Sequence, residues 1–163
     1  MRVTNPCTTS QWVELFKNIN PARHPKGGFA PHKPLLLVCI MDAVVRGQIR
    51  VGERVGNPRM LVKDRYTELW TASVSDRIPK VGDVRLPLYH LKTQGLWRAL
   101  GRFGAEASSP SDLVAIDIRD DLMDSMSDRL GRAYLLMALT ETYFSTFEAE
   151  AIHDLFYTWQ VKQ

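Results

Sequence analysis

The feature that most constrains the fold is an apolar run, interrupted only by Asp42, that begins at Pro34 and continues to Val45. Its residues are apolar on every side of a helix, and the run is too long, and too free of alternation, for a buried strand. Pro34 suits the first turn of a helix, where its missing N–H needs no partner, and Gly47 suits the end of one. The run therefore predicts a helix that is buried on all sides.

Other segments carry weaker patterns of helices and short strands. Trp12, Leu15, Phe16 and Ile19 follow the i, i+3, i+4, i+7 spacing of an amphipathic helix, with Thr9 or Ser10 as its N-cap. We expect further helices at about 58–70, 119–130, 132–144 and 151–159. Short strands are expected at 48–51 and 114–118, an edge strand or irregular segment at 85–91, and a turn at 95–98.

These elements predict a single domain spanning 1–163, of the helix-predominant α+β class, with a few short strands around the buried central helix. A chain of 163 residues buries close to 70% of its extended surface and needs no disulfide or metal to fold. Cys7 and Cys39 are far apart, and Cys39 reads as an inert buried thiol. The start has no apolar signal run and no segment reaches the length of a membrane span, so we expect a cytoplasmic location without membrane contact.

Charge is divided unevenly along the chain. Residues 1–105 hold 17 Lys and Arg against 7 Asp and Glu, whereas residues 106–163 hold 4 against 11. A basic first two-thirds is typical of a protein with a polyanion partner, and we expect the acidic remainder to face elsewhere. The alternative is that the charges interleave in the folded molecule.

A basic loop leads into the central helix. Arg23, His24 and Lys26 are set among prolines and glycines, and His32 and Lys33 follow directly at the helix start. Free N–H groups and the positive end of a helix attract phosphate, so this segment predicts an anion site. The alternative is a solvated loop in which a backbone group satisfies His32.

The segment around Pro87 mixes apolar surface with charge. Pro87, Leu88 and Tyr89 are flanked by cationic side chains at Arg85, His90, Lys92 and Arg98. A phosphorothioate replaces one non-bridging phosphate oxygen with a larger, more polarizable and more weakly hydrated sulfur, which an apolar notch ringed with cations would select. The alternative is that Leu88 and Leu91 belong to the core and Pro87 only protects an edge.

Catalytic motifs are absent from the sequence. The four histidines lack the spacing of a zinc protease, and neither glycine-rich nucleotide motif occurs. Asp117, Asp120 and Asp121 resemble a metal-binding cluster, but carboxylates are also favoured in the first turn of a helix. We therefore expect no catalytic residues, no metal and no cofactor, and keep a metal-dependent nuclease that uses 117–121 as the minor alternative.

The order of these blocks resembles the sulfur-binding domain of phosphorothioation-dependent type IV restriction endonucleases. The resemblance rests on 30–34 followed by an aliphatic helix, on 86–88 with Leu91, on 95–97, and on a helical stretch that ends at Tyr143 and Phe144. It extends from the first helix to about Phe144, and the proline-histidine-lysine-proline-leucine block is its most specific part. Such a domain docks on duplex DNA and leaves cleavage to a separate HNH nuclease domain.

The resemblance implies a sulfur pocket and a set of DNA contacts. The expected pocket residues are His32, Lys33, Pro87, Leu88, Tyr89 and His90. The expected DNA contacts are Arg23, His24, Lys26, Lys33, Arg85, Lys92, Arg98 and Arg102. Leu86 stands where the family often has an aromatic residue, and Tyr89 lies on the Pro87 side of an extended segment, which makes it the candidate replacement.

The expected function is thus sequence-context-dependent binding of phosphorothioate-modified double-stranded DNA. The expected partner is a fused or separate HNH nuclease, and the protein would act as a monomer or homodimer. The main alternative is a general DNA-binding or protein-interaction module without selectivity for sulfur.

Overall fold

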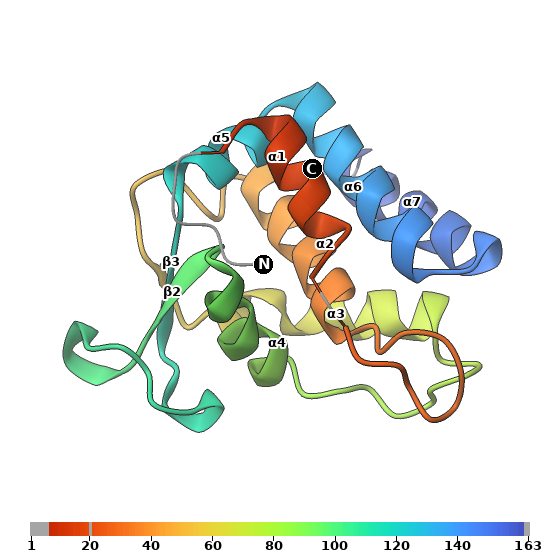
Figure 1. The fold of residues 1–163 in the computed structure, drawn as a ribbon, viewed down its shortest axis with the longest axis horizontal. Coiled ribbons are helices and arrows are strands. Elements are labelled where there is room, and N and C mark those ends of the chain that lie inside the picture. Colours follow the sequence, from red (N-terminus) through yellow and green to blue (C-terminus); the bar gives the residue numbers. More distant parts are fainter. Residues whose placement is uncertain (1–6, 20, 162–163) are drawn as a thin grey trace.

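The computed structural model describes residues 7–19 and 21–161, and in them helices surround a central helix with a small sheet at one side (Figure 1). The predicted helix-predominant α+β class is confirmed. The helices are α1 (Thr9–Phe16), α2 (His32–Val45), α3 (Pro58–Ser73), α4 (Arg85–His90), α5 (Asp120–Ser127), α6 (Arg129–Tyr143) and α7 (Thr146–Val161). Short 3₁₀ turns are η1 (Leu91–Gln94), η2 (Arg102–Gly104) and η3 (Pro110–Asp112).

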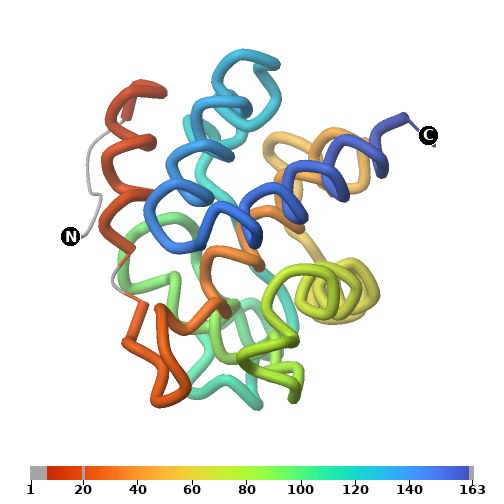
Figure 2. Tube along the Cα trace, turned by 90° about the vertical axis from the view of Figure 1, so that its right-hand side faces the viewer, coloured from red at the N-terminus to blue at the C-terminus, as the bar shows by residue number. Residues whose placement is uncertain are grey.

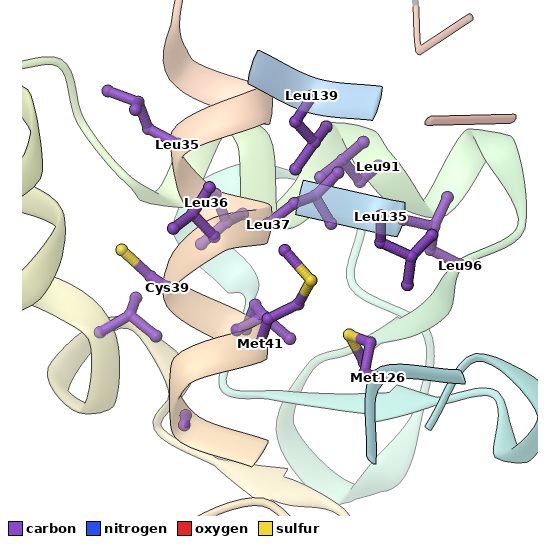
Figure 3. Close-up of a cluster of buried hydrophobic side chains, with 14 of the residues drawn as sticks. Leu35, Leu36, Leu37, Cys39, Met41, Leu91, Leu96, Met126, Leu135 and Leu139 are labelled. Carbon is purple, nitrogen blue, oxygen red and sulfur yellow. The ribbon is translucent and has the colours of Figure 1, made fainter. Parts of the chain in front are cut away.

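Helix α2 is the buried centre that the apolar run predicts. Every residue from Pro34 to Val44 is buried, and α2 contacts α3, α4, α5, α6 and α7. Leu37 and Met41 lie on the side of Leu135, whereas Cys39 points to the opposite side of the helix (Figure 3). Contacts on all sides explain why the run is apolar apart from Asp42, which is buried and forms a salt bridge with Arg46 at 2.7 Å. Burial raises the pKa of the Cys39 thiol.

The remaining predicted helices are all present, and α7 begins at Thr146, five residues before its expected start. The N-cap of α1 is Thr8, one residue before the predicted pair, and its side chain forms a capping box with Gln11. Asp128 caps α6 by accepting the backbone N–H of Gly131 at 2.7 Å. A cap one or two residues from the expected one leaves the apolar stripe, and therefore the packing, unchanged.

The sheet consists of β1 (Val55–Gly56), β2 (Trp97–Leu100) and β3 (Ala115–Ile118), in the antiparallel order β1-β3-β2. The predicted strand at 114–118 is therefore confirmed, but 48–51 forms a turn rather than a strand. The turn predicted at 95–98 is confined to Gly95, which ends η1 with a φ of 84°. Trp97 already belongs to β2, so neither β1 nor β2 was predicted.

The elements of the fold lie on two opposite sides of the molecule. Loop 21–31, segment 74–84, α4 and the β2–β3 connection lie in the lower part of both Figure 1 and Figure 2, and we call this side the lower face. Helices α5 and α6 lie in the upper part of both views. No helix in the described part of the chain is long and apolar enough to cross a membrane.

Candidate nucleic-acid interface

The segment around Pro87 is a helix, not the predicted edge strand or irregular segment. Pro87 is the third residue of α4, where the backbone N–H has no helical partner in any case. The turn closes when the N–H of Leu88 donates to the carbonyl of Val84 at 3.2 Å. Just before the helix, the carboxylate of Asp83 accepts the backbone N–H of Arg85 at 3.0 Å. A proline that excludes a central strand is therefore compatible with a first helical turn.

Helical geometry decides which side chains lie beside Pro87. Residues three and four apart share a helix face, so Pro87 lies beside His90; Pro87 is itself buried, but it lines the same cleft as His90, Leu86 and Thr93. Leu88 and Leu91 point inward and are fully buried. The prediction that places Leu88 in the pocket is thus wrong, and its alternative, a core leucine, is right.

Tyr89 also lies outside the predicted pocket. An extended segment would place Tyr89 on the same side as Pro87, but two residues of a helix turn it by about 200°. Its ring lies under the ammonium of Lys92, with Nζ 4.2 Å from the ring centroid, and meets the His90 ring edge-on at 5.2 Å. The aromatic wall expected from Tyr89 is therefore absent from the cleft beside Pro87.

The remaining predicted pocket residues do converge. A cleft of about 370 Å³, which we call the proline cleft, opens on the lower face between α4, the start of α2 and loop 21–31. It is lined by Pro21, Ala22, Ala30, His32, Lys33, Leu86, Pro87, His90 and Thr93. Four of the six predicted pocket residues, His32, Lys33, Pro87 and His90, are therefore brought together by two helices that lie far apart in the sequence.

His32 is fixed in the wall of this cleft by packing. Its ring meets Trp70 of α3 edge-on, with centroids 5.0 Å apart. On another side the backbone of Gly82 comes so close that a Cβ at this position would lie 2.2 Å from the ring Nε2. Burial lowers the pKa of His32, with a smaller contribution from His24, so the imidazole is predominantly neutral at pH 7.

Lys33 has a structural partner as well as a place in the cleft. Its Nζ donates to the carbonyl oxygen of Ile19 at 3.3 Å, and the same oxygen accepts Gln94 Nε2 at 2.7 Å. Burial lowers the pKa of Lys33. An ammonium carries three donors, so a ligand in the cleft can receive the other two.

The basic loop forms a closed hairpin, in which Arg23 and Phe29 pair as an antiparallel bridge. The N–H of Ala30 donates to the carbonyl of Ala22 at 2.7 Å, and positive φ values at Gly27 and Gly28 allow the tight turn. Arg77 holds the hairpin from outside, because its Nη1 donates to the carbonyls of Gly27 and Phe29 at 2.8 and 3.0 Å. Loop 21–31 is thereby held at the edge of the proline cleft.

Five of the eight predicted DNA contacts lie on segments of the lower face, namely Arg23, His24, Lys26, Arg85 and Arg102, whereas Lys33, Lys92 and Arg98 lie on α2, η1 and β2. Several of the eight have protein partners. The Arg23 guanidinium lies over the Phe29 ring at 4.3 Å. Arg85 forms a salt bridge with Asp83 at 2.8 Å. The side chains of Lys26, Arg98 and Arg102 are exposed, and His24 is partly buried and accepts the Lys26 N–H at 3.1 Å. Lys92 stacks on Tyr89 as described above.

A larger cleft of about 610 Å³ lies next to the proline cleft, and Thr93 lines both. Its cations Lys92, Arg98 and Arg119 face the carboxylates of Glu106, Asp117 and Asp120. The acidic residues at the start of the second part of the chain thus lie among basic ones, and only the later helices face away. The charge division in the sequence is therefore only partly a division in space.

The carboxylates at 117–121 are spread over different partners. Asp121 forms a salt bridge with Arg119 at 2.8 Å and accepts the backbone N–H groups of Cys7 and Leu122. Asp117 lies opposite Arg98 in the β2–β3 register. Among the described residues no three His, Cys, Asp or Glu side chains form a group that could hold a metal ion.

Several lining residues of the proline cleft were missed in the sequence. Pro21, Ala22 and Ala30 reach the cleft only because the hairpin folds back, and no local pattern reveals this. Leu86 and Thr93 could have been found, because Val84, Leu88 and Leu91 follow the i, i+4, i+7 spacing of a helix.

Comparison with known proteins finds no matching family model and no curated protein with significant similarity.

Proposed function

We propose that the chain binds phosphorothioate-modified duplex DNA and that the proline cleft receives the backbone sulfur. The observation that carries this proposal is the composition of the cleft. Apolar groups of Leu86, Pro87 and Ala30 stand beside the polar tips of His32 and Lys33, on the face that also holds the basic loop.

The chemistry of the two ligands explains why this composition discriminates. A phosphate oxygen is strongly hydrated and loses free energy when it enters an apolar wall, whereas sulfur is larger, more polarizable and easier to dehydrate. A neutral His32 lowers the dehydration cost of the wall itself. The Lys33 ammonium supplies a positive charge that balances the negative charge of the phosphorothioate group.

The protein acts in this proposal as a reader in the cytoplasm, and strand cleavage belongs to an HNH nuclease that is fused or separate. Arginine matches the edge of guanine bidentately, so the sequence context is read by an arginine of the lower face. Arg23 and Arg102 are exposed candidates on the lower face, and Arg98 is an exposed candidate on β2.

Substitution of Pro87 tests the pocket. Pro87→Ala removes apolar wall without removing a helical hydrogen bond, and we expect the affinity for the modified duplex to fall about tenfold, with little change for the unmodified one. Lys33→Ala should weaken binding to both duplexes, because it removes charge. The measurement is equilibrium binding of each variant to two duplexes that differ in a single sulfur.

Pro79→Ala is the matched control, because Pro79 is exposed and does not line the proline cleft. Its binding to both duplexes should equal that of the original protein. Equal losses for the two duplexes with Pro87→Ala would contradict the assignment of the pocket and leave a general DNA-binding module.

A further inference from the structure

A second cleft, which we call the α3 cleft, opens beside the proline cleft. It has a volume of about 510 Å³ and lies between α3 and the segment that leads into α4. His32 and Leu86 line both clefts, so the two are separated only by the wall that these side chains form. A ligand chain that enters one cleft can continue into the other.

The α3 cleft carries three cations that are not held in a salt bridge in the described part of the chain. Arg59 and Lys63 are spaced i, i+4 on α3 and therefore share a face, and Lys80 lies across the cleft from them. Their side chains are exposed, and none of the three forms a salt bridge with a residue in the described part of the chain. Solvent-exposed cations gathered around a concave surface attract an anion.

The carboxylate in this cleft is already engaged. Asp83 binds Arg85 through two oxygens, with Nη2 at 2.8 Å and Nε at 3.1 and 3.3 Å, and this contact is the main cause that lowers the pKa of Asp83, with a smaller contribution from the charge of Arg59. The neighbouring cleft beyond Thr93 differs, because three carboxylates face its three cations. A DNA backbone that leaves the proline cleft is therefore attracted more strongly towards α3.

We propose that the α3 cleft binds an unmodified phosphate of the DNA strand whose sulfur occupies the proline cleft. This inference rests on the proposed function for the identity of the strand. Arg59 and Lys63 contact the phosphate oxygens from α3, and Lys80 contacts them from the opposite wall. The site contributes affinity but no selectivity for sulfur, because every linkage of the backbone other than the modified one carries only oxygen.

The test is a double substitution, Arg59→Gln with Lys63→Gln, measured on modified and unmodified duplexes. We expect both affinities to fall about tenfold, the preference for sulfur to stay unchanged, and the slope of log K against log salt to become smaller by about 1 to 2. The matched control is Lys17→Gln with Arg129→Gln, which removes two exposed cations from α6 and the end of α1. If both doubles change binding equally, the site is overturned.

Asp83→Asn provides a test in the opposite direction. It removes the carboxylate and releases Arg85, so binding to both duplexes should become about threefold tighter, a gain that misfolding cannot produce. Binding no tighter than that of the original protein would overturn the inference. A protein with no preference for sulfur, but with these losses and gains, would refute the sulfur pocket and retain the phosphate site.

Discussion

Gly82 and His32 show how a single missing side chain shapes the candidate site. The ring of His32 occupies the space in which any Cβ at position 82 would stand. Trp70 limits the ring from another side, so His32 cannot simply rotate away. The position of His32 in the wall between the two clefts thus depends on Gly82, which has no side chain.

Gly82→Ala should displace His32 and destabilise the protein by about 1–3 kcal/mol, as expected for overpacking. Urea denaturation measures the change, and binding to the modified duplex should weaken with it. Gly56→Ala is the control, because a Cβ at Gly56 has no atom within 4 Å. A Gly82→Ala protein as stable as the control would show that His32 is not held as described.

The two partly buried histidines give a stability that depends on pH. Burial is the main cause that lowers the pKa of His32 and of His153 below their ordinary value of 6.5. The folded protein therefore binds fewer protons near this pH than the unfolded chain does. The stability that the two neutral histidines contribute is fully present above pH 6.5, and it decreases as the pH falls through that value.

We expect a smaller free energy of unfolding at pH 5.5 than at pH 7.5, measured by urea denaturation at both values. His32→Gln and His153→Gln should each reduce the difference. The lowered pKa of Asp83 and of Asp121 acts only below about pH 4, outside this range. Equal stability at the two pH values would refute the assignment.

At the scale of elements, Arg77 connects three parts of the fold. Its guanidinium bonds to the basic hairpin at Gly27 and Phe29, and its Nε lies 2.6 Å from Glu148 Oε2 of α7. Glu148 in turn accepts the backbone N–H of Ser145 at 3.0 Å, just before α7 begins. The position of the hairpin beside the proline cleft therefore depends on a side chain of a distant segment.

Arg77→Ala should destabilise the protein by about 2–4 kcal/mol, because it leaves the Glu148 carboxylate partly buried without its cation. It should also weaken DNA binding, since the hairpin loses its outer support. Thermal and urea denaturation measure the first effect. Lys17→Ala, which breaks an exposed pair with Glu14, should cost less than about 1 kcal/mol and serves as the control. Similar losses for the two variants would contradict the role of Arg77.

The sequence predicts long helices well and short elements poorly. Helices α2, α3 and α6 have enough turns for their composition or periodicity to be recognised, whereas β1 has only two residues. Strand β2 was missed because Trp97, Ala99 and Leu100 are all buried, so it shows little alternation. The short helix α4 was mistaken for an extended segment because Pro87 was given more weight than the spacing of its buried leucines.

The candidate site is predictable to the extent that it is local. His32 and Lys33 were identified because they begin a helix, and Pro87 because it lies among cations. Tyr89 and Leu88 were misplaced because a wrong backbone conformation changes which side chains share a face. The contributions of Gly82, Trp70 and the hairpin alanines depend on tertiary packing, for which the sequence contains no local signal.

At the scale of the whole molecule, a lower face with two clefts and a basic hairpin lies opposite α5 and the start of α6 (Figures 1 and 2). Such a division suits a protein that approaches a polyanion with one side, and long-range attraction is sensitive to salt. Recognition of a buried sulfur should depend less on salt, because screening acts weakly on buried groups. A change in salt concentration therefore separates the contribution of long-range charge attraction from the contribution of sulfur recognition.

The most direct test of sulfur recognition is a salt titration of binding to two otherwise identical duplexes, of which one carries a single stereodefined phosphorothioate. We predict a preference of about 100-fold for the modified duplex, equivalent to about 2.7 kcal/mol, that persists as salt rises and both affinities fall. Equal affinities at every salt concentration would contradict the account and leave a DNA-binding surface without a sulfur pocket.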